Sequence, residues 1–236
     1  MRSMSSPLKQ VAIFLVGAPG TGKSTVARKL TARLGYGLFL SGQALRRIAK
    51  EEPHTPMGRE VGERLGRNES MPIDLYCEVV GQALRGHAHT GLVIDGYPRT
   101  ADQCLAIPSV LRSAGLPHAT VIGIALHAST ELSIDRISKR SVCPACGGDD
   151  TSPQRCCDTG SRSKRTDDAP GNTVIRLARY RDTAPAIAEV FARSWHYADV
   201  DASGHLDDVM TGILRAVAEF EPVSLASHAQ VIHERG

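Results

Sequence analysis

The chain alternates between short apolar runs and longer stretches in which apolar and polar residues mix. The apolar runs lack internal alternation and occupy residues 11–16, 37–41, 92–95 and 119–126, with a less regular fifth run at 196–201. Such runs are typical of strands buried on both faces. The stretches at 24–35, 75–86 and 129–140 place apolar residues at helical spacing. The pattern predicts an α/β fold: an open, five-stranded parallel sheet flanked by helices on both faces.

Two segments interrupt this alternation. Residues 42–91 contain three helical patterns without a strand, and residues 141–171 are rich in Gly, Pro, Cys, Ser and Asp. Both are interpreted as insertions, and insertions at strand ends commonly cover a substrate. The sheet domain is then expected to comprise residues 1–41, 92–140 and 172–221. Residues 222–236 lack clear periodicity and are expected to form a frayed tail.

Length and charge narrow the class of protein. A chain of 236 residues fits one domain with insertions, and its net charge of +3 is only mildly basic. Lys and Arg are spread along the chain, so nucleic acid is not an expected partner. The apolar runs are too short to cross a bilayer, and Met1–Lys9 lacks the apolar core of a signal peptide. We therefore expect a cytoplasmic protein without membrane association, and a monomer.

The cysteines fall into two groups. Four of the six lie within one insertion, at Cys143, Cys146, Cys156 and Cys157. In a reducing compartment such a cluster favours a metal site over disulfide bonds. Cys77 and Cys104 stand apart and are expected to be buried free thiols.

A phosphate-binding loop follows the first predicted strand directly. The segment GAPGTGKST places Gly17, Gly22, Lys23 and Ser24 in the G-x-x-x-x-G-K-[ST] pattern, and a helical pattern begins at once. Glycines let successive backbone N–H groups point at a phosphate, and Lys23 brings a cation to the β and γ oxygens. Ser24 is expected to hold Mg²⁺ through its hydroxyl. Gly20 and Thr21 within the loop, and Thr25 directly after it, are expected to contact ATP as well.

A second polar segment follows the predicted strand at 92–95. The sequence LVIDGYPRTADQ places Asp95 at the end of that strand, with Gly96, Arg99 and Gln103 after it. A carboxylate at this position can steady a water bound to Mg²⁺, and the adjacent guanidinium can bind a phosphate in bidentate fashion.

Taken together, these segments resemble the adenylate kinase family of P-loop NTPases. GAPGTGKST is similar to its phosphate loop, LSGQALR (40–46) to its monophosphate-site helix, and DGYPRT (95–100) to its DGFPRT box. DRISKR (135–140) resembles the helix that enters its lid, and RTDD (165–168) the lid's R-x-D-D, with Arg176 on the following helix. The similar segments occur in the same order as in the family, from about residue 11 to about residue 215. It implies that residues 42–91 bind the monophosphate and that 141–171 form a lid.

The resemblance implies a role for each charged residue. Arg46 and Arg99 would hold the acceptor's α-phosphate, while Lys23, Arg140, Arg165 and Arg176 would surround the transferring group. Arg136 would contact the donor adenine, and Asp167 and Asp168 would link the closed lid. Phosphoryl transfer between two anionic nucleotides needs charge neutralisation and alignment more than it needs a covalent nucleophile. A set of converging cationic side chains therefore suits this reaction.

The implied reaction is the transfer of a phosphoryl group from ATP to AMP. The acceptor site would comprise Ser41, Arg46, Gly96, Arg99, Gln103, Arg165 and Arg176. A Gln amide complements adenine, whereas related pyrimidine kinases carry Asn at the place of Gln103. Ser41 is intermediate between the Thr of AMP-specific enzymes and the Ala of pyrimidine kinases. A kinase for UMP, CMP or a modified nucleotide is the first alternative, and a nucleotide-binding regulator with weak catalysis is the second.

Two departures from the family pattern bear on metals. Gln43 replaces an acidic residue that normally orders water around Mg²⁺, which leaves Asp95 to do so alone. In the lid, Cys143 and Cys146 form one C-x-x-C pair, but Cys156 and Cys157 are adjacent and do not form a second. Structural zinc bound by these four cysteines and a metal-free lid both remain open.

Overall fold

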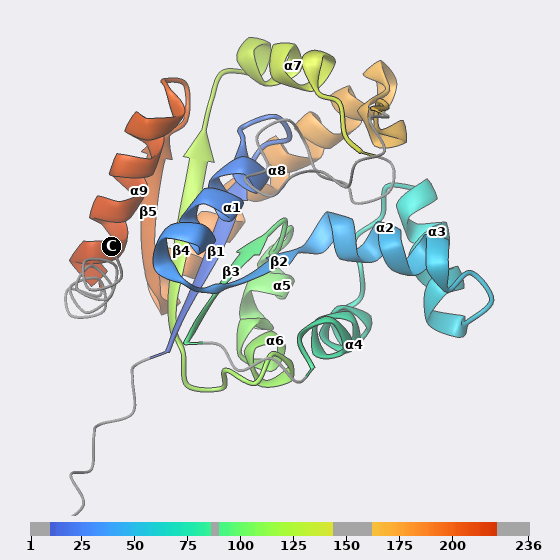
Figure 1. The fold of residues 1–236 in the computed structure, drawn as a ribbon, viewed down its shortest axis with the longest axis horizontal. Coiled ribbons are helices and arrows are strands. Elements are labelled where there is room, and N and C mark those ends of the chain that lie inside the picture. Colours follow the sequence, from blue (N-terminus) through green and yellow to red (C-terminus); the bar gives the residue numbers. More distant parts are fainter. Residues whose placement is uncertain (1–9, 86–89, 144–161, 221–236) are drawn as a thin grey trace, which may run out of the picture.

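The computed structural model describes residues 10–85, 90–143 and 162–220. Its sheet contains β1 (Val11–Gly17), β2 (Gly37–Leu40), β3 (Gly91–Asp95), β4 (Thr120–His127) and β5 (His196–Asp201). All neighbouring strands are parallel, in the order β2-β3-β1-β4-β5 (Figure 1). The predicted α/β class and the five parallel strands are confirmed. Several strand ends differ from the predicted runs by one residue, and Ser41 begins a helix instead of ending β2.

Helices connect successive strands and flank the sheet. Their bounds are α1 (Lys23–Leu34), α2 (Ser41–Glu51), α3 (Pro56–Gly66), α4 (Ile73–Leu84), α5 (Ala101–Leu105), α6 (Ile107–Ser113), α7 (Thr130–Lys139), α8 (Pro170–Ser194) and α9 (Leu206–Phe220). A short 3-10 helix, η1 (Thr166–Asp168), precedes α8. Connections of this kind allow parallel strands to lie side by side.

The sheet has an apolar core on each face. Phe14 of β1 belongs to one core, with side chains of α4, α6 and α8, whereas Ile13 belongs to the other, with side chains of α1 and α9. Successive residues of a strand point to opposite faces, so both faces of β1 require apolar residues. This explains why the run at 11–16 shows no alternation of apolar and polar residues.

The first insertion emerges at the carboxyl end of β2, and the second follows α7. The first contains α2, α3 and α4 and returns at Gly91. In the second, Val142 and Ser163 form an isolated bridge, and η1 and α8 follow. Residues 144–161, which include most of the predicted lid, and the predicted tail at 222–236 lie outside the described residues.

Side-chain caps fix where helices α5 and α7 begin. The Ser129 hydroxyl accepts a hydrogen bond from the Leu132 N–H at the start of α7, and the Thr100 hydroxyl accepts one from Gln103 at the start of α5. Such caps satisfy backbone N–H groups that the first turn leaves without partners. They set the helical phase that places Gln103 on α5 and Arg136 on α7.

Candidate active site

The predicted site residues gather at the carboxyl edge of the sheet. Gly17 ends β1, Ser41 follows β2, and Asp95 ends β3, and these three strands are neighbours in the sheet. Ligands of open α/β sheets bind at this edge. The topology therefore brings the phosphate loop and the two other predicted segments together.

The phosphate loop turns on two glycines whose backbone conformation other residues rarely adopt. Gly20 and Gly22 have φ angles of 87° and 90°, in the left-handed region that glycine adopts without strain. A Cβ atom on Gly20 would lie 2.3 Å from the carbonyl oxygen of Ser133 in α7. Thr21 is buried, and its hydroxyl donates to the Ala18 carbonyl at 3.0 Å. The loop is therefore held tightly between β1, α1 and α7.

Lys23 begins α1 and turns its ammonium group back over the loop. Its Nζ donates to the carbonyl oxygens of Gly17 and Ala18, at 2.8 and 2.7 Å. Burial lowers the pKa of Lys23 to about 8, and although Asp95 opposes this shift, Arg176 and other nearby guanidinium groups add to it. Lys23 is thus bonded to neutral carbonyl groups and lies near several other cations. A phosphate group bound here would stabilise its positive charge.

Ser24 and Asp95 form the oxygen-rich part of the site. The Ser24 hydroxyl donates to Oδ2 of Asp95, whose side chain is buried. Oδ1 of Asp95 has no hydrogen-bond partner among the residues that the structure describes. Hydroxyl and carboxylate oxygens are the ligands that Mg²⁺ prefers, so these two residues fit the predicted metal. Thr25 follows Ser24 in the first turn of α1.

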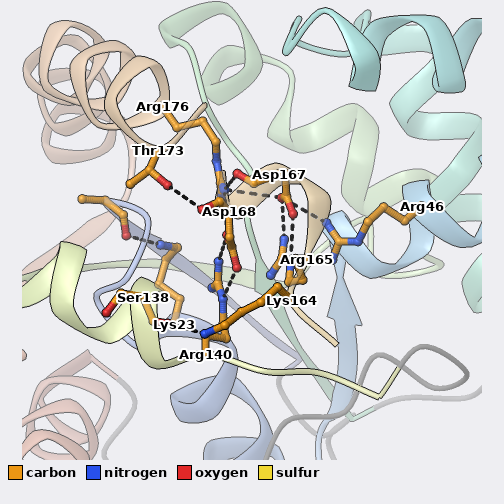
Figure 2. A network of polar contacts seen from close by, with 11 residues as sticks. Lys23, Arg46, Ser138, Arg140, Lys164, Arg165, Asp167, Asp168, Thr173 and Arg176 are labelled. Carbon is orange, nitrogen blue, oxygen red and sulfur yellow. Dashed lines mark hydrogen bonds and ion pairs between the residues drawn. The ribbon is translucent and has the colours of Figure 1, made fainter. Parts of the chain in front are cut away.

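Four arginines meet at two neighbouring aspartates, as Figure 2 shows. Arg140 pairs with both carboxylate oxygens of Asp168, with Nε to Oδ2 at 2.8 Å. Arg165 pairs with both oxygens of Asp167, at 3.0 and 2.7 Å. Arg176 of α8 contacts both aspartates, and Arg46 of α2 reaches Asp167 at 3.6 Å. Four of the six predicted arginines therefore lie together, although they come from four separate segments.

The electrostatics of Asp167 reflect this crowding of positive charge. Burial alone would raise the pKa of Asp167, but Arg165, Arg176 and Arg46 outweigh it and lower the pKa to about 2. Burial lowers the pKa of Arg46 to about 10, and Arg165 adds to that shift. The cluster holds more positive than negative charge among these residues, as a binding site for polyphosphate requires.

The predicted acceptor residues lie beside the cluster. A small hollow is lined by residues that include Leu45, Met71, Tyr76, Gly96, Arg99 and Gln103. Arg99 is exposed, and its Nε donates to the Gly96 carbonyl at 3.0 Å. The buried Gln103 amide accepts from the Arg99 N–H and donates to the Met71 carbonyl, both at 2.9 Å. Arg99 and Gln103 face the same hollow, as their spacing predicted.

Two other predicted residues lie at the edges of this arrangement. Arg136 of α7 donates to the carbonyl of Ala202, after β5, at 2.9 Å. Cys143 is buried, but Cys146, Cys156 and Cys157 lie outside the described residues. Within the described residues, no group of three or more His, Cys, Asp or Glu side chains is placed to hold a metal.

Comparison with known proteins identifies the family. The family model described as adenylate kinase matches residues 15–195. The adenylate kinase of Pyrococcus furiosus is 31% identical over 205 residues, which cover 84% of this chain and 91% of the relative. That of Chlamydia felis is 30% identical over 217 residues, covering 90% of this chain and 100% of the relative. The chain belongs to the adenylate kinase family.

Membership of the adenylate kinase family makes this chain a phosphotransferase with a phosphate group as acceptor. The converging cations described above suit that class of reaction. No helix within the described residues is long and apolar enough to cross a membrane.

Tyr76 also lines this adenylate kinase site, although no sequence motif points to it. Tyr76 lies at an apolar position of α4, where the helical pattern marks it only as a core residue. In the structure it lines the acceptor hollow, and its hydroxyl lies 2.6 Å from that of Ser41. No sequence signal joins these two positions, because their contact depends on how α2 and α4 pack.

Proposed function

We propose that this chain transfers the γ-phosphoryl group of ATP to AMP and so forms two molecules of ADP. The observation that carries the proposal is the convergence of Lys23 with four arginines between the phosphate loop and the acceptor hollow. The arginines are Arg46, Arg140, Arg165 and Arg176, joined through Asp167 and Asp168 (Figure 2).

The proposed division of roles follows from position. Lys23 would hold the β- and γ-phosphates, because its ammonium group already lies over the loop that would hold them. Arg140, Arg165 and Arg176 would surround the transferring group, while Arg46 and Arg99 would hold the α-phosphate of AMP. Preorganised cations of this kind stabilise the charge of the transition state without having to reorganise during the reaction.

The two aspartates would serve as positioning residues for these cations. Asp168 has a side chain only 3% exposed and joins Arg140 to Arg176. Asp167 joins Arg165 to Arg46, and so connects the segment before α8 to the monophosphate-binding insertion. Closure at this point would exclude water, which otherwise competes with AMP for the phosphoryl group.

Mg²⁺ would be held by Ser24 and Asp95. When bound, it would supply charge neutralisation on the phosphate oxygens of ATP. The buried Oδ1 of Asp95, which has no hydrogen-bond partner among the described residues, supports this assignment. Arg136, anchored to the Ala202 carbonyl, would border the adenine of ATP.

AMP is the proposed acceptor because Gln103 presents an amide to the acceptor hollow. An initial-rate panel of AMP, CMP, UMP and GMP with ATP and Mg²⁺ tests this directly. A value of kcat/KM for AMP at least about tenfold above the others is expected. A better pyrimidine acceptor would favour the alternative kinase that Ser41 suggests. Absence of transfer to every monophosphate, with ATP still bound, would favour the regulator.

Zinc in the lid and the oligomeric state of the protein can each be measured directly. Metal analysis after purification under reducing conditions distinguishes a zinc-bearing lid, with about one zinc per chain, from a metal-free lid. We propose that the enzyme acts as a cytoplasmic monomer that binds no nucleic acid. Light scattering coupled to size-exclusion chromatography measures its mass in solution.

A further inference from the structure

Asn68 follows helix α3 in a backbone conformation that glycine adopts more readily than other residues. Its φ angle is 55°, in the left-handed region. The Asn68 N–H donates to the carbonyl of Leu65 at 3.1 Å, and the Glu69 N–H donates to that of Arg64 at 2.8 Å. These two bonds form a Schellman motif, which commonly ends a helix with a left-handed residue. The motif fixes the backbone from which the Asn68 side chain extends.

The Asn68 side chain reaches from the first insertion to α8. Its Nδ2 donates to Oδ1 of Asn172 at 3.4 Å, and both side chains are partly buried. Asn172 lies in the first turn of α8, and Arg176 lies four residues further along. Residues four apart lie on the same face of a helix, one turn from each other. The contact therefore joins α3 to the part of α8 that carries Arg176.

Asn68 also lies next to the rim of the acceptor hollow. Glu69 and Met71 both line this hollow. The Met71 carbonyl accepts from Nε2 of Gln103 at 2.9 Å, so the segment after Asn68 is bonded to the residue proposed to face the acceptor base. The asparagine contact thus ties the rim of the hollow to the helix that carries Arg176.

A charged contact joins the same insertion to the segment before α8. Arg46 of α2 reaches Asp167 at 3.6 Å. In the proposed reaction Arg46 also holds the α-phosphate of AMP, so that phosphate and Asp167 would compete for one guanidinium group. The amides of Asn68 and Asn172 carry no charge, and a bound phosphate does not compete for them in this way. The neutral contact can therefore persist when the charged one is weakened.

We propose that Asn68 and Asn172 form an uncharged latch, which holds the first insertion against α8 while the acceptor is bound. Both are positioning residues, because they act through the rim of the hollow and through α8 without touching a nucleotide. The inference rests on the proposed function, since it concerns the acceptor of that reaction. Loss of the latch lowers the fraction of enzyme that is ready to bind the acceptor, and the apparent affinity falls with that fraction.

Two substitutions test the latch from its two sides. Asn172→Ala removes the acceptor oxygen, and Asn68→Gly removes the donor while it keeps the left-handed backbone. Each should raise the KM for AMP by about threefold to about tenfold, as expected for one lost hydrogen bond. The kcat and the KM for ATP should stay within about twofold, because the phosphate loop holds ATP. The double variant should show no larger effect than the more affected single variant.

Gln82→Ala is the matched control for the kinetic test. The Gln82 amide also makes a contact of 3.4 Å, to Glu52, but both of these residues belong to the first insertion. Removing this contact leaves the connection to α8 intact. The KM for AMP should therefore stay at its wild-type value.

Isotope labelling provides a readout that needs no turnover. The chain has only two asparagines, so protein labelled with nitrogen-15 in the asparagine side chains gives two NH2 groups to follow by NMR. The two single variants assign them, since each removes one group. Hydrogen exchange of the Asn68 amide should be at least about threefold faster in Asn172→Ala than in wild type, and AMP should slow it in wild type.

Three results would overturn the inference. They are an unchanged KM for AMP in both single variants, an equal rise in KM for AMP and ATP, and an Asn68 exchange rate that Asn172→Ala leaves unchanged. A wild-type enzyme that phosphorylates no monophosphate would instead refute the proposed function. Because the exchange measurement detects the latch without catalysis, the two failures can be told apart.

Discussion

Arg46 and Asp167 form an ion pair across the site, with Nη1 and Oδ2 3.6 Å apart. The pair connects the first insertion to the segment before α8, and the same carboxylate also accepts from Arg165. Asp167 is therefore shared by cations from separate segments. Its removal should leave positive charges close together without the group that holds them.

Asp167→Asn should lower the free energy of unfolding, and the loss should depend on pH in a defined direction. The pKa of Asp167 falls from an ordinary 3.8 to about 2 in the folded protein. Its stabilisation is therefore complete above about pH 5 and is lost as pH falls through the range from about 4 to about 2. Urea unfolding should show the difference between wild type and variant shrinking by about 1 kcal/mol from pH 6 to pH 3.

Asp182→Asn is the matched control for this experiment. Asp182 also lies beside an arginine, Arg181, at 3.5 Å, but both side chains are largely exposed. An exposed ion pair of this kind contributes little to stability. A pH dependence of similar size in both variants would contradict the special position of Asp167.

The pKa of Lys23 predicts how activity responds to alkaline pH. Burial lowers this pKa to about 8, so the free enzyme loses the cation as pH rises through that value. The kcat/KM for ATP should fall by about tenfold per pH unit above about pH 8.5. The kcat at saturating ATP should fall less, because a bound phosphate favours the charged amine. A kcat/KM profile that stays flat to pH 9.5 would contradict the prediction.

Lys23→Ala and Arg99→Ala should each lower phosphoryl transfer by at least about a hundredfold, because each removes a cation facing charge that develops in the transition state. Circular dichroism should show that both variants fold. Calorimetry should separate them: Arg99→Ala should weaken the binding of AMP more than that of ATP. Equal weakening of both ligands would assign Arg99 a different role.

The sequence predicted which residues gather at the site. It did not predict which arginine pairs with which aspartate. Strand positions and the phosphate loop followed from local patterns, since a buried strand needs an unbroken apolar run and the loop needs its glycines at fixed spacing. The distribution of arginines between Asp167 and Asp168 depends on how α2, α7 and α8 pack. The Ser41–Tyr76 contact has the same origin, and Ser41 was placed in a strand because helix boundaries are weakly marked.

The Gln103 amide has two hydrogen-bond partners inside the protein. Its Oε1 accepts from the Arg99 N–H and its Nε2 donates to the Met71 carbonyl. These bonds leave one N–H and one lone pair for the acceptor base, which matches the donor and acceptor of adenine. Gln103→Ala should therefore reduce the preference for AMP over CMP by about tenfold.

Gln103→Ala should also lower the thermal midpoint, because the Met71 carbonyl loses a buried partner. Gln103→Glu separates selectivity from stability: its carboxylate can still accept from the Arg99 N–H but cannot donate to adenine or to Met71. Gln82→Ala, an exposed glutamine of α4, serves as the control and should change neither property. If Gln103→Glu retained the full preference for AMP while its thermal midpoint fell, Gln103 would support the hollow without selecting the base, and the specificity would have to come from other residues around it.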